Sequence, residues 1–144
     1  MAGIIGANDP KTKLIGAAPS TRFMSFKVCS GFSCTDAAII KALHNAFYNG
    51  QIMPDVINIS LGSMEGYRRA VYTDLMNDLS SKFGTVIFIS ASNNGPGFRS
   101  LNSLGNSGAT VTVGANVSAE TLSCLLYTSP SPRDATLSRM PSSA

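Results

Sequence analysis

Three short runs of apolar residues, many of them β-branched, constrain the fold of this chain more than any other feature. The runs are Asp55–Leu61 (DVINISL), Thr85–Ala91 (TVIFISA) and Thr110–Ala115 (TVTVGA). Apolar runs of this length are typical of strands that are buried on both faces of a parallel sheet. Because parallel neighbours need a crossover connection, we expect helices or long loops between them.

Two longer stretches repeat their apolar residues at three- and four-residue steps, which predicts helices with one buried face. These stretches are Ala37–Tyr48 and Glu65–Phe83. Ser33–Asp36 resembles a capping box before the first helix, with a carboxylate in its fourth place. Asn49–Gly50 and Gly84 are expected to end the two helices as C-caps.

Two further segments complete this outline. Thr21–Val28 alternates apolar and polar residues well enough for another strand, and Ser92–Gly108 is a predicted loop because it is rich in Gly, Ser and Asn. Strands that alternate with helices predict an α/β fold with a parallel sheet and flanking helices. Ligands bind at the carboxyl ends of the strands in such sheets, which directs attention to Ser60–Gly62 and Ala91–Gly95.

The overall composition excludes several classes of function. The 144 residues suffice for one domain, and 44% apolar against 13% charged residues excludes a highly charged disordered chain. No apolar run is long enough to span a membrane. The net charge of +3 comes from scattered residues without a basic stripe, so we expect neither nucleic acid nor a membrane as a partner.

The composition changes at Cys124. Cys124–Ala144 is rich in Ser, Thr and Pro and lacks any helix or strand period, so we expect a disordered tail after a partial domain of residues 1–123. Cys124–Asp134 (CLLYTSPSPRD) is similar to a translated transposase adapter from sequencing libraries, and Ser138–Ala144 to the adapter segment that follows it. We therefore interpret the tail as an artefact that does not belong to the fold.

The start of the chain also differs from the natural start of a domain. Met1–Ala7 is apolar and helical in pattern, but no N-cap residue precedes it. The charged region, long apolar core and cleavage site of a secretory signal are missing. We expect a domain that is truncated at both ends.

Six short motifs follow one another along the chain. They lie at Ala2–Gly6 (AGIIG), Gly16–Pro19 (GAAP), Phe26–Val28 (FKV), Asp55–Gly62 (DVINISLG), Ala91–Gly97 (ASNNGPG) and Val111–Ala115 (VTVGA). In this order they resemble motifs of the subtilisin-like serine proteases (peptidase S8 family). Each motif alone is weak, but six in register indicate a fragment of a subtilisin-like three-layer fold with a parallel sheet and flanking helices.

This resemblance implies proteolysis by a Ser-His-Asp triad, with hydrogen-bond donors for the oxyanion. Asn93 falls on the family's oxyanion-hole asparagine. From the local residues alone, Asn93–Gly95 is better interpreted as a turn, whereas the whole register favours the oxyanion role.

The resemblance also implies where an extended substrate binds. Ser60, Leu61 and Gly62 match a segment that pairs with the substrate as an added strand. Ala91 and Ser92 match a wall of the primary pocket, although the family usually has Gly in place of Ser92.

A second pairing segment is a weaker match. It would be Phe32–Cys34, with Ser33 at its centre, and it lacks both glycines of the family's Gly-Ser-Gly. The implied partners are protein or peptide substrates.

The triad itself is missing from this chain. His44 is the only histidine, and its place in a predicted helix indicates a surface or core-edge residue. No Gly-Thr-Ser-Met-Ala segment follows Ala115, and Gly62–Met64 lacks the threonine. The chain as it stands is expected to be inactive, because an oxyanion donor alone cannot form an acyl-enzyme. The alternatives are a non-catalytic pseudo-protease that binds extended peptides and an unrelated parallel α/β protein.

Two remaining features leave alternatives open. Cys29 and Cys34 could form a small disulfide loop in an oxidising compartment or remain two thiols. Asn8–Asp9 lies where some family members hold calcium, but one carboxylate supplies too few oxygen ligands, so no cofactor is expected. Secreted or vacuolar residence is an expectation from the family.

Overall fold

The computed structural model describes residues 1–31, 33–49, 52–62, 70–95 and 97–119. The chain divides into two units, Met1–Val113 and Gly114–Ala144. All helices and strands named below belong to the first unit. The predicted tail Cys124–Ala144, residues 65–69 of the second predicted helix, and Ser63–Met64 lie outside the described residues.

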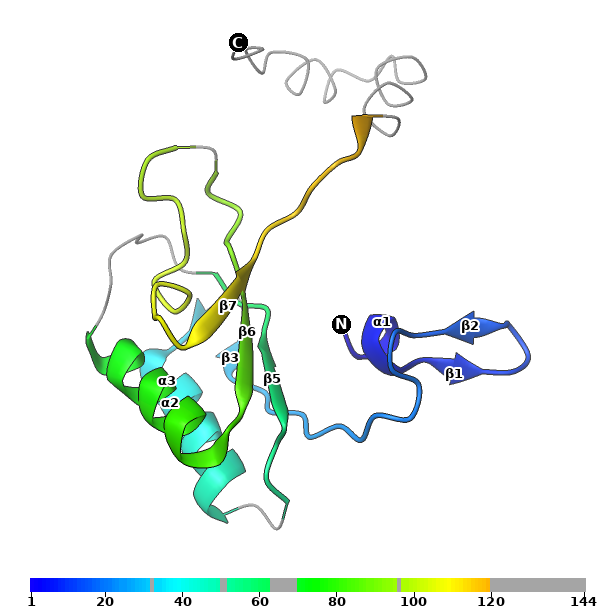
Figure 1. Cartoon of the computed structure of the whole chain (residues 1–144), viewed down its shortest axis with the longest axis horizontal. Coiled ribbons are helices and arrows are strands. Elements are labelled where there is room, and N and C mark those ends of the chain that lie inside the picture. Colours follow the sequence, from blue (N-terminus) through cyan, green and yellow to red (C-terminus); the bar gives the residue numbers. More distant parts are fainter. Residues whose placement is uncertain (32, 50–51, 63–69, 96, 120–144) are drawn as a thin grey trace. The chain divides into compact units, whose positions relative to one another are not determined.

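A three-stranded parallel sheet organises the described part of the chain (Figure 1). Its strands are β5 (Val56–Ile59), β6 (Val86–Ser90) and β7 (Thr110–Val113), in that order across the sheet. All three predicted strands and their parallel direction are therefore confirmed, although each strand is shorter than the apolar run that predicted it. The α/β fold class is confirmed with them.

Two helices cover one face of this sheet, on the same side in Figure 1. They are α2 (Asp36–His44) and α3 (Ala70–Phe83). Ile87 and Ile89 of β6 are 0% and 1% exposed and form one core with the buried residues of the helices. The core members are Ile39, Leu43, Ala46, Phe47, Ile59, Tyr72, Met76, Leu79, Ile87, Ile89 and Leu104.

The N-cap of the first helix lies two residues after the predicted one. Thr35 is the N-cap, and its Oγ1 accepts a hydrogen bond of 3.3 Å from the Ala38 amide. The capping box that began at Ser33 was wrong, because Ser33 pairs within a hairpin strand and is unavailable as a cap. The helix continues as a π-helical turn, η1 (Asn45–Asn49). In that turn Phe47 stacks on Phe83, with ring centroids 4.8 Å apart.

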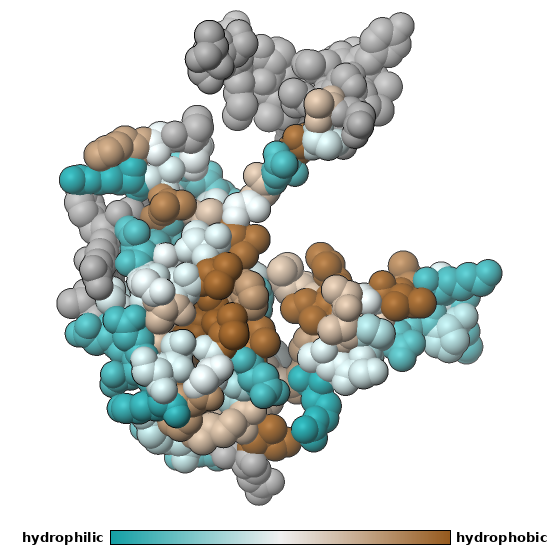
Figure 2. Space-filling view, viewed as in Figure 1, coloured by the Kyte–Doolittle hydropathy of each residue, from teal (hydrophilic) through white to brown (hydrophobic). Residues whose placement is uncertain are grey.

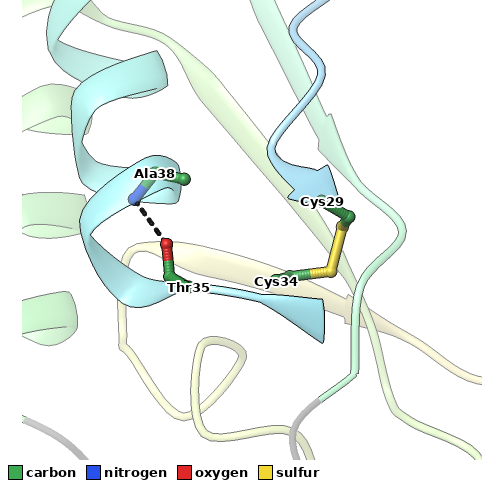
Figure 3. Close-up of a disulfide and its surroundings, with 4 residues drawn as sticks. All are labelled: Cys29, Cys34, Thr35 and Ala38. Atoms are coloured by element: carbon green, nitrogen blue, oxygen red, sulfur yellow. Dashed lines mark hydrogen bonds between the residues drawn. A yellow bond between two sulfur atoms is a disulfide. The ribbon is translucent and has the colours of Figure 1, made fainter. Parts of the chain in front are cut away.

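A short hairpin precedes α2 and carries the two cysteines. Its strands are β3 (Cys29–Ser30) and β4 (Ser33–Cys34). Cys29 and Cys34 lie opposite each other in the ladder and form a disulfide, beside the Thr35 cap in Figure 3. The structure thus favours the disulfide over two thiols.

The strand predicted at Thr21–Val28 was wrong. These residues form neither helix nor strand, and all except Val28 are exposed. Alternating residues favour an extended backbone, but a strand also needs a neighbour for its amides and carbonyls. None of the strands described here pairs with this segment.

The N-terminal residues form a separate small motif. Helix α1 (Ala2–Gly6) is followed by an antiparallel pair, β1 (Asn8–Asp9) and β2 (Leu14–Ile15). The helical character predicted for Met1–Ala7 is confirmed. Among the described helices, none has the length and apolar character needed to cross a bilayer.

The second face of the sheet is apolar and open among the described residues. Val56, Val86, Val111 and Val113 are between 44% and 57% exposed on it. Figure 2 shows apolar surface over β6 and β7. Parallel sheets are normally covered on both faces, so this face has the composition of a buried surface.

Candidate functional site

The carboxyl ends of β5 and β6 bring two predicted site segments together. The parallel ladder pairs Ile59 with Ile89, so the residues that follow each strand leave the sheet side by side. A methyl group added at Gly62 would lie 3.5 Å from the Oγ atom of Ser92. The predicted substrate edge and the predicted pocket wall therefore lie close together.

The third predicted segment reaches the same place. Cys34 of β4 lines a cavity of about 150 Å³, and Leu61 and Gly62 line it as well. Asp36 at the start of α2 and Tyr72 of α3 also border this cavity. Ser33, the other residue of β4, is exposed, and Phe32 lies outside the described residues.

Hydrogen bonds before and after β5 show which way two of its neighbouring carbonyls point. The Asp55 carbonyl points toward β6, because it accepts a hydrogen bond of 3.0 Å from the Val86 amide. The Leu61 carbonyl points the same way and accepts 3.1 Å from Ser90 Oγ. Backbone groups of successive residues in an extended chain point to opposite edges, so we expect the groups of Ser60 and Gly62 to point away from β6.

This outer edge can receive another strand. β5 is an edge strand of the described sheet. Outward amides and carbonyls at such an edge pair readily with an extended peptide. We therefore expect an added strand to pair at Ser60–Gly62.

The chain changes direction sharply at the end of β6. The Ala91 amide donates 2.8 Å to the Val113 carbonyl, which holds this point to β7. Ser92 then adopts φ = +88°, a backbone conformation that side chains with a Cβ rarely adopt. Asn93 follows with an exposed side chain. Its exposure fits both a turn residue and a donor to a bound group, so the oxyanion role stays a prediction.

Sequence reasoning missed Asn102. This residue lies within the predicted loop Ser92–Gly108, yet it is 0% exposed. Its side-chain amide donates to the carbonyls of Leu61 and Ser90, and its Oδ1 accepts from the Leu104 amide. Nothing in a Gly-, Ser- and Asn-rich loop distinguishes this asparagine from its neighbours, so no sequence signal could have found it.

Asp9, at the position where some family members hold calcium, accepts hydrogen bonds from nearby residues of its own turn. Asp9 Oδ1 accepts 2.9 Å from the Lys11 amide, and Oδ2 accepts 2.6 Å from Thr12 Oγ1. These hydrogen bonds, that of the Thr12 side chain foremost, hold the pKa of Asp9 below its ordinary value. Within the described residues, no three His, Cys, Asp or Glu side chains gather as a metal site.

The strain at Ser92 predicts a stabilising substitution. Ser92→Gly should raise the midpoint of thermal unfolding, because glycine adopts φ = +88° without the cost of about 1 kcal/mol that a Cβ brings. Ser92→Ala is the matched control, since it keeps the Cβ, and it should leave the midpoint near that of the parent chain. Circular dichroism measures the unfolding midpoints of both variants. A lower midpoint for the glycine variant would contradict the backbone strain at Ser92.

The Asp9 hydrogen bonds predict a pH dependence in the β1–β2 hairpin. Because its pKa is lowered on folding, the carboxylate contributes stability above the ordinary pKa, and this contribution is lost as pH falls through the folded value. Carboxyl carbon shifts in NMR should show Asp9 titrating below an unstructured peptide standard. Thr12→Val should raise the Asp9 pKa, and an unchanged value would refute the role of the threonine.

Comparison with known proteins gives the same family that the sequence motifs resemble. Residues 1–138 match the model of the subtilase family, a range that includes the first part of Cys124–Ala144. The chain is also 32% identical over 91 residues to the subtilisin-like protease SBT4.15 of Arabidopsis thaliana. That alignment covers 62% of this chain and 11% of the Arabidopsis protein, so the chain spans only about a tenth of its relative. An unrelated α/β protein with coincidental motifs is thereby excluded, and the chain belongs to the subtilase family of serine proteases.

Proposed function

We propose that this chain is part of a serine-type endopeptidase and supplies three elements of its active site. These are the substrate-pairing edge at Ser60–Gly62, the pocket wall at Ala91–Ser92 and the oxyanion donor Asn93. One observation carries the proposal: the Leu61 carbonyl accepts a hydrogen bond from Ser90 of β6. From this we infer that the backbone groups of Ser60 and Gly62 are directed outward. That edge lies directly beside Ser92.

An extended peptide would bind here as an additional strand. Its amides and carbonyls pair with the outward groups of Ser60 and Gly62. The strand then runs past Ser92, and the scissile carbonyl comes to lie near Asn93. The Asn93 side-chain amide donates to the carbonyl oxygen as negative charge develops on it in the tetrahedral intermediate.

The chain alone is proposed to bind peptides without cleaving them. His44, its only histidine, is exposed on α2 and stacks on Tyr48 with ring centroids 4.8 Å apart. A histidine in this position cannot serve as the base for a serine at the sheet end. A non-catalytic protein that binds extended peptides is the second candidate, and it is favoured by the same open edge.

The disulfide bears on where such a protein resides. Disulfides persist in oxidising compartments, so the Cys29–Cys34 bond supports a secreted or vacuolar setting. No cofactor is proposed, because the reaction needs only a nucleophile, a base, an orienting carboxylate and oxyanion donors.

The segment Cys124–Ala144 is proposed to lie outside the protease domain. Its resemblance to translated adapter supports this. Sequencing the transcript across Ser123–Cys124 without a transposase library should give a different downstream reading frame. Recovery of the same segment followed by a stop codon would refute it.

The 144-residue chain should bind an extended peptide and should not react with a serine-directed probe. We would measure fluorescence anisotropy with a fluorescein-labelled hexa-alanine that carries terminal lysines. The same peptide with alternate N-methylated amides is the control, because it lacks the donors that strand pairing needs. Equal affinity for the two peptides would contradict strand pairing at the Ser60–Gly62 edge.

The second arm uses a fluorophosphonate, which labels activated serines covalently. An active subtilisin is the positive control, and the chain should remain unlabelled. Labelling of the chain would show a nucleophile and overturn its proposed inactivity.

In the complete enzyme, Asn93→Ala should lower kcat by about 10²–10³ with little change in KM, the cost typical of removing one oxyanion donor. Asn94→Ala is the matched neighbouring control. Steady-state kinetics separate the two parameters. A raised KM with unchanged kcat would place Asn93 in substrate binding instead.

A further inference from the structure

Asn102 joins the two strand ends that form the candidate site. It lies in the segment between β6 and β7 and is completely buried. Its Nδ2 atom donates to the Leu61 carbonyl beyond β5 and, at 3.2 Å, to the Ser90 carbonyl at the end of β6. One side chain thus bridges both strands at the point where the parallel ladder ends.

The orientation of the Asn102 amide is determined by its surroundings. Its Oδ1 accepts 3.1 Å from the Leu104 amide, so the oxygen faces an N–H while Nδ2 faces two carbonyls. A flipped amide would direct its oxygen at the carbonyl oxygens of Leu61 and Ser90. Such a network has one satisfied arrangement, which fixes the side chain.

The backbone of Asn102 is held just as firmly. Its amide donates 3.1 Å to the Ala91 carbonyl, and its own carbonyl accepts 3.0 Å from the Gly105 amide. Side chain and backbone together therefore reach Leu61, Ser90 and Ala91. Leu61 belongs to the predicted edge, Ala91 belongs to the predicted pocket wall, and Ser90 directly precedes Ala91.

The hydrogen bond from Asn102 helps to set the direction of the Leu61 carbonyl. β5 ends at Ile59, so the sheet ladder no longer determines the backbone direction at Leu61. The hydrogen bonds from Asn102 and Ser90 replace the ladder there. If the backbone stays extended past Ile59, an inward Leu61 leaves the groups of Ser60 and Gly62 facing the outer edge of β5.

We propose that Asn102 is a positioning residue for the substrate-pairing edge: it fixes Leu61 so that Ser60 and Gly62 present their backbone groups to an extended peptide. This inference rests on the proposed function, because it assigns a role within the same site. Asn102 acts through Leu61 and does not itself touch the peptide.

The test compares peptide affinity among variants of the 144-residue chain, using the labelled hexa-alanine peptide. Asn102→Ala should raise Kd at least tenfold. Ser90→Ala removes only the second donor to Leu61 and should raise Kd about threefold. Leu79→Ala in α3 is the control for general destabilisation, since Leu79 is 1% exposed and belongs to the core. Its Kd should stay within twofold of the parent, measured below all unfolding midpoints.

A second readout needs no peptide. Asn102→Ala and Ser90→Ala should shift the amide resonances of Gly62 and Ser92, while those of Ile57 and Ile87 in the ladder remain in place. Ser90→Ala keeps this readout accessible if the Asn102 variant fails to fold. A structural role alone would move all four resonances or none.

The outcomes separate this inference from the proposed function. Equal Kd values for the parent chain, Asn102→Ala and Ser90→Ala, or a loss in Leu79→Ala as large as in Asn102→Ala, would overturn the positioning role and leave peptide binding intact. If the parent chain does not bind the peptide, the proposed function of the edge fails, and the positioning role for a substrate falls with it. The amide shifts would then still show whether Asn102 orders Leu61.

Discussion

The parallel ladder between β5 and β6 determines where the segments of the candidate site lie. Ile59 pairs with Ile89, and this single register places everything that follows the two strands at one end of the sheet. A slip of one residue would turn every side chain of β5 to the opposite face and expose Ile59 instead of burying it. The buried isoleucines therefore fix the register, and the register fixes the site.

Polar contacts complete what the apolar core begins. Beyond Ile59 and Ser90 the ladder has ended, and side chains take over the hydrogen bonds that strands would otherwise supply. Thr85 Oγ1 closes the opposite end of the sheet in the same way, by donating 2.8 Å to the Pro54 carbonyl. A buried carbonyl without a partner is costly, so both ends of the sheet depend on such contacts. The open edge at Ser60–Gly62 differs because its groups face outward.

Local patterns in the sequence predicted where helices and strands form. They did not predict whether a strand has a neighbour or which residue caps a helix. The apolar runs predicted β5, β6 and β7, since burial on a parallel sheet needs that composition. The Thr21–Val28 strand failed because alternation describes a backbone shape and not the presence of a neighbour. The predicted cap was Ser33 and the actual cap is Thr35. The prediction failed because Ser33 has an equally suitable side chain but belongs to the hairpin.

The candidate site was predictable only in part. Its segments could be located, because strand ends are visible in the sequence and the motifs resembled those of a family. The burial of Asn102 was not predictable, because it depends on contacts between distant residues. Asn102 and Leu61 are 41 positions apart along the chain. The sequence thus located the segments of the candidate site, and the structure shows that Asn102 links two of them.

The scalar coupling across the hydrogen bond from the Asn102 side-chain nitrogen to the Leu61 carbonyl carbon tests most directly whether Asn102 orients Leu61. A long-range HNCO experiment on the isotopically labelled chain detects such couplings. We expect a cross-peak that joins Asn102 Nδ2 to the Leu61 carbonyl, together with rapid amide exchange at Gly62. Absence of that cross-peak, with a Gly62 amide protected from exchange, would mean that the edge is directed inward and that Asn102 does not orient it.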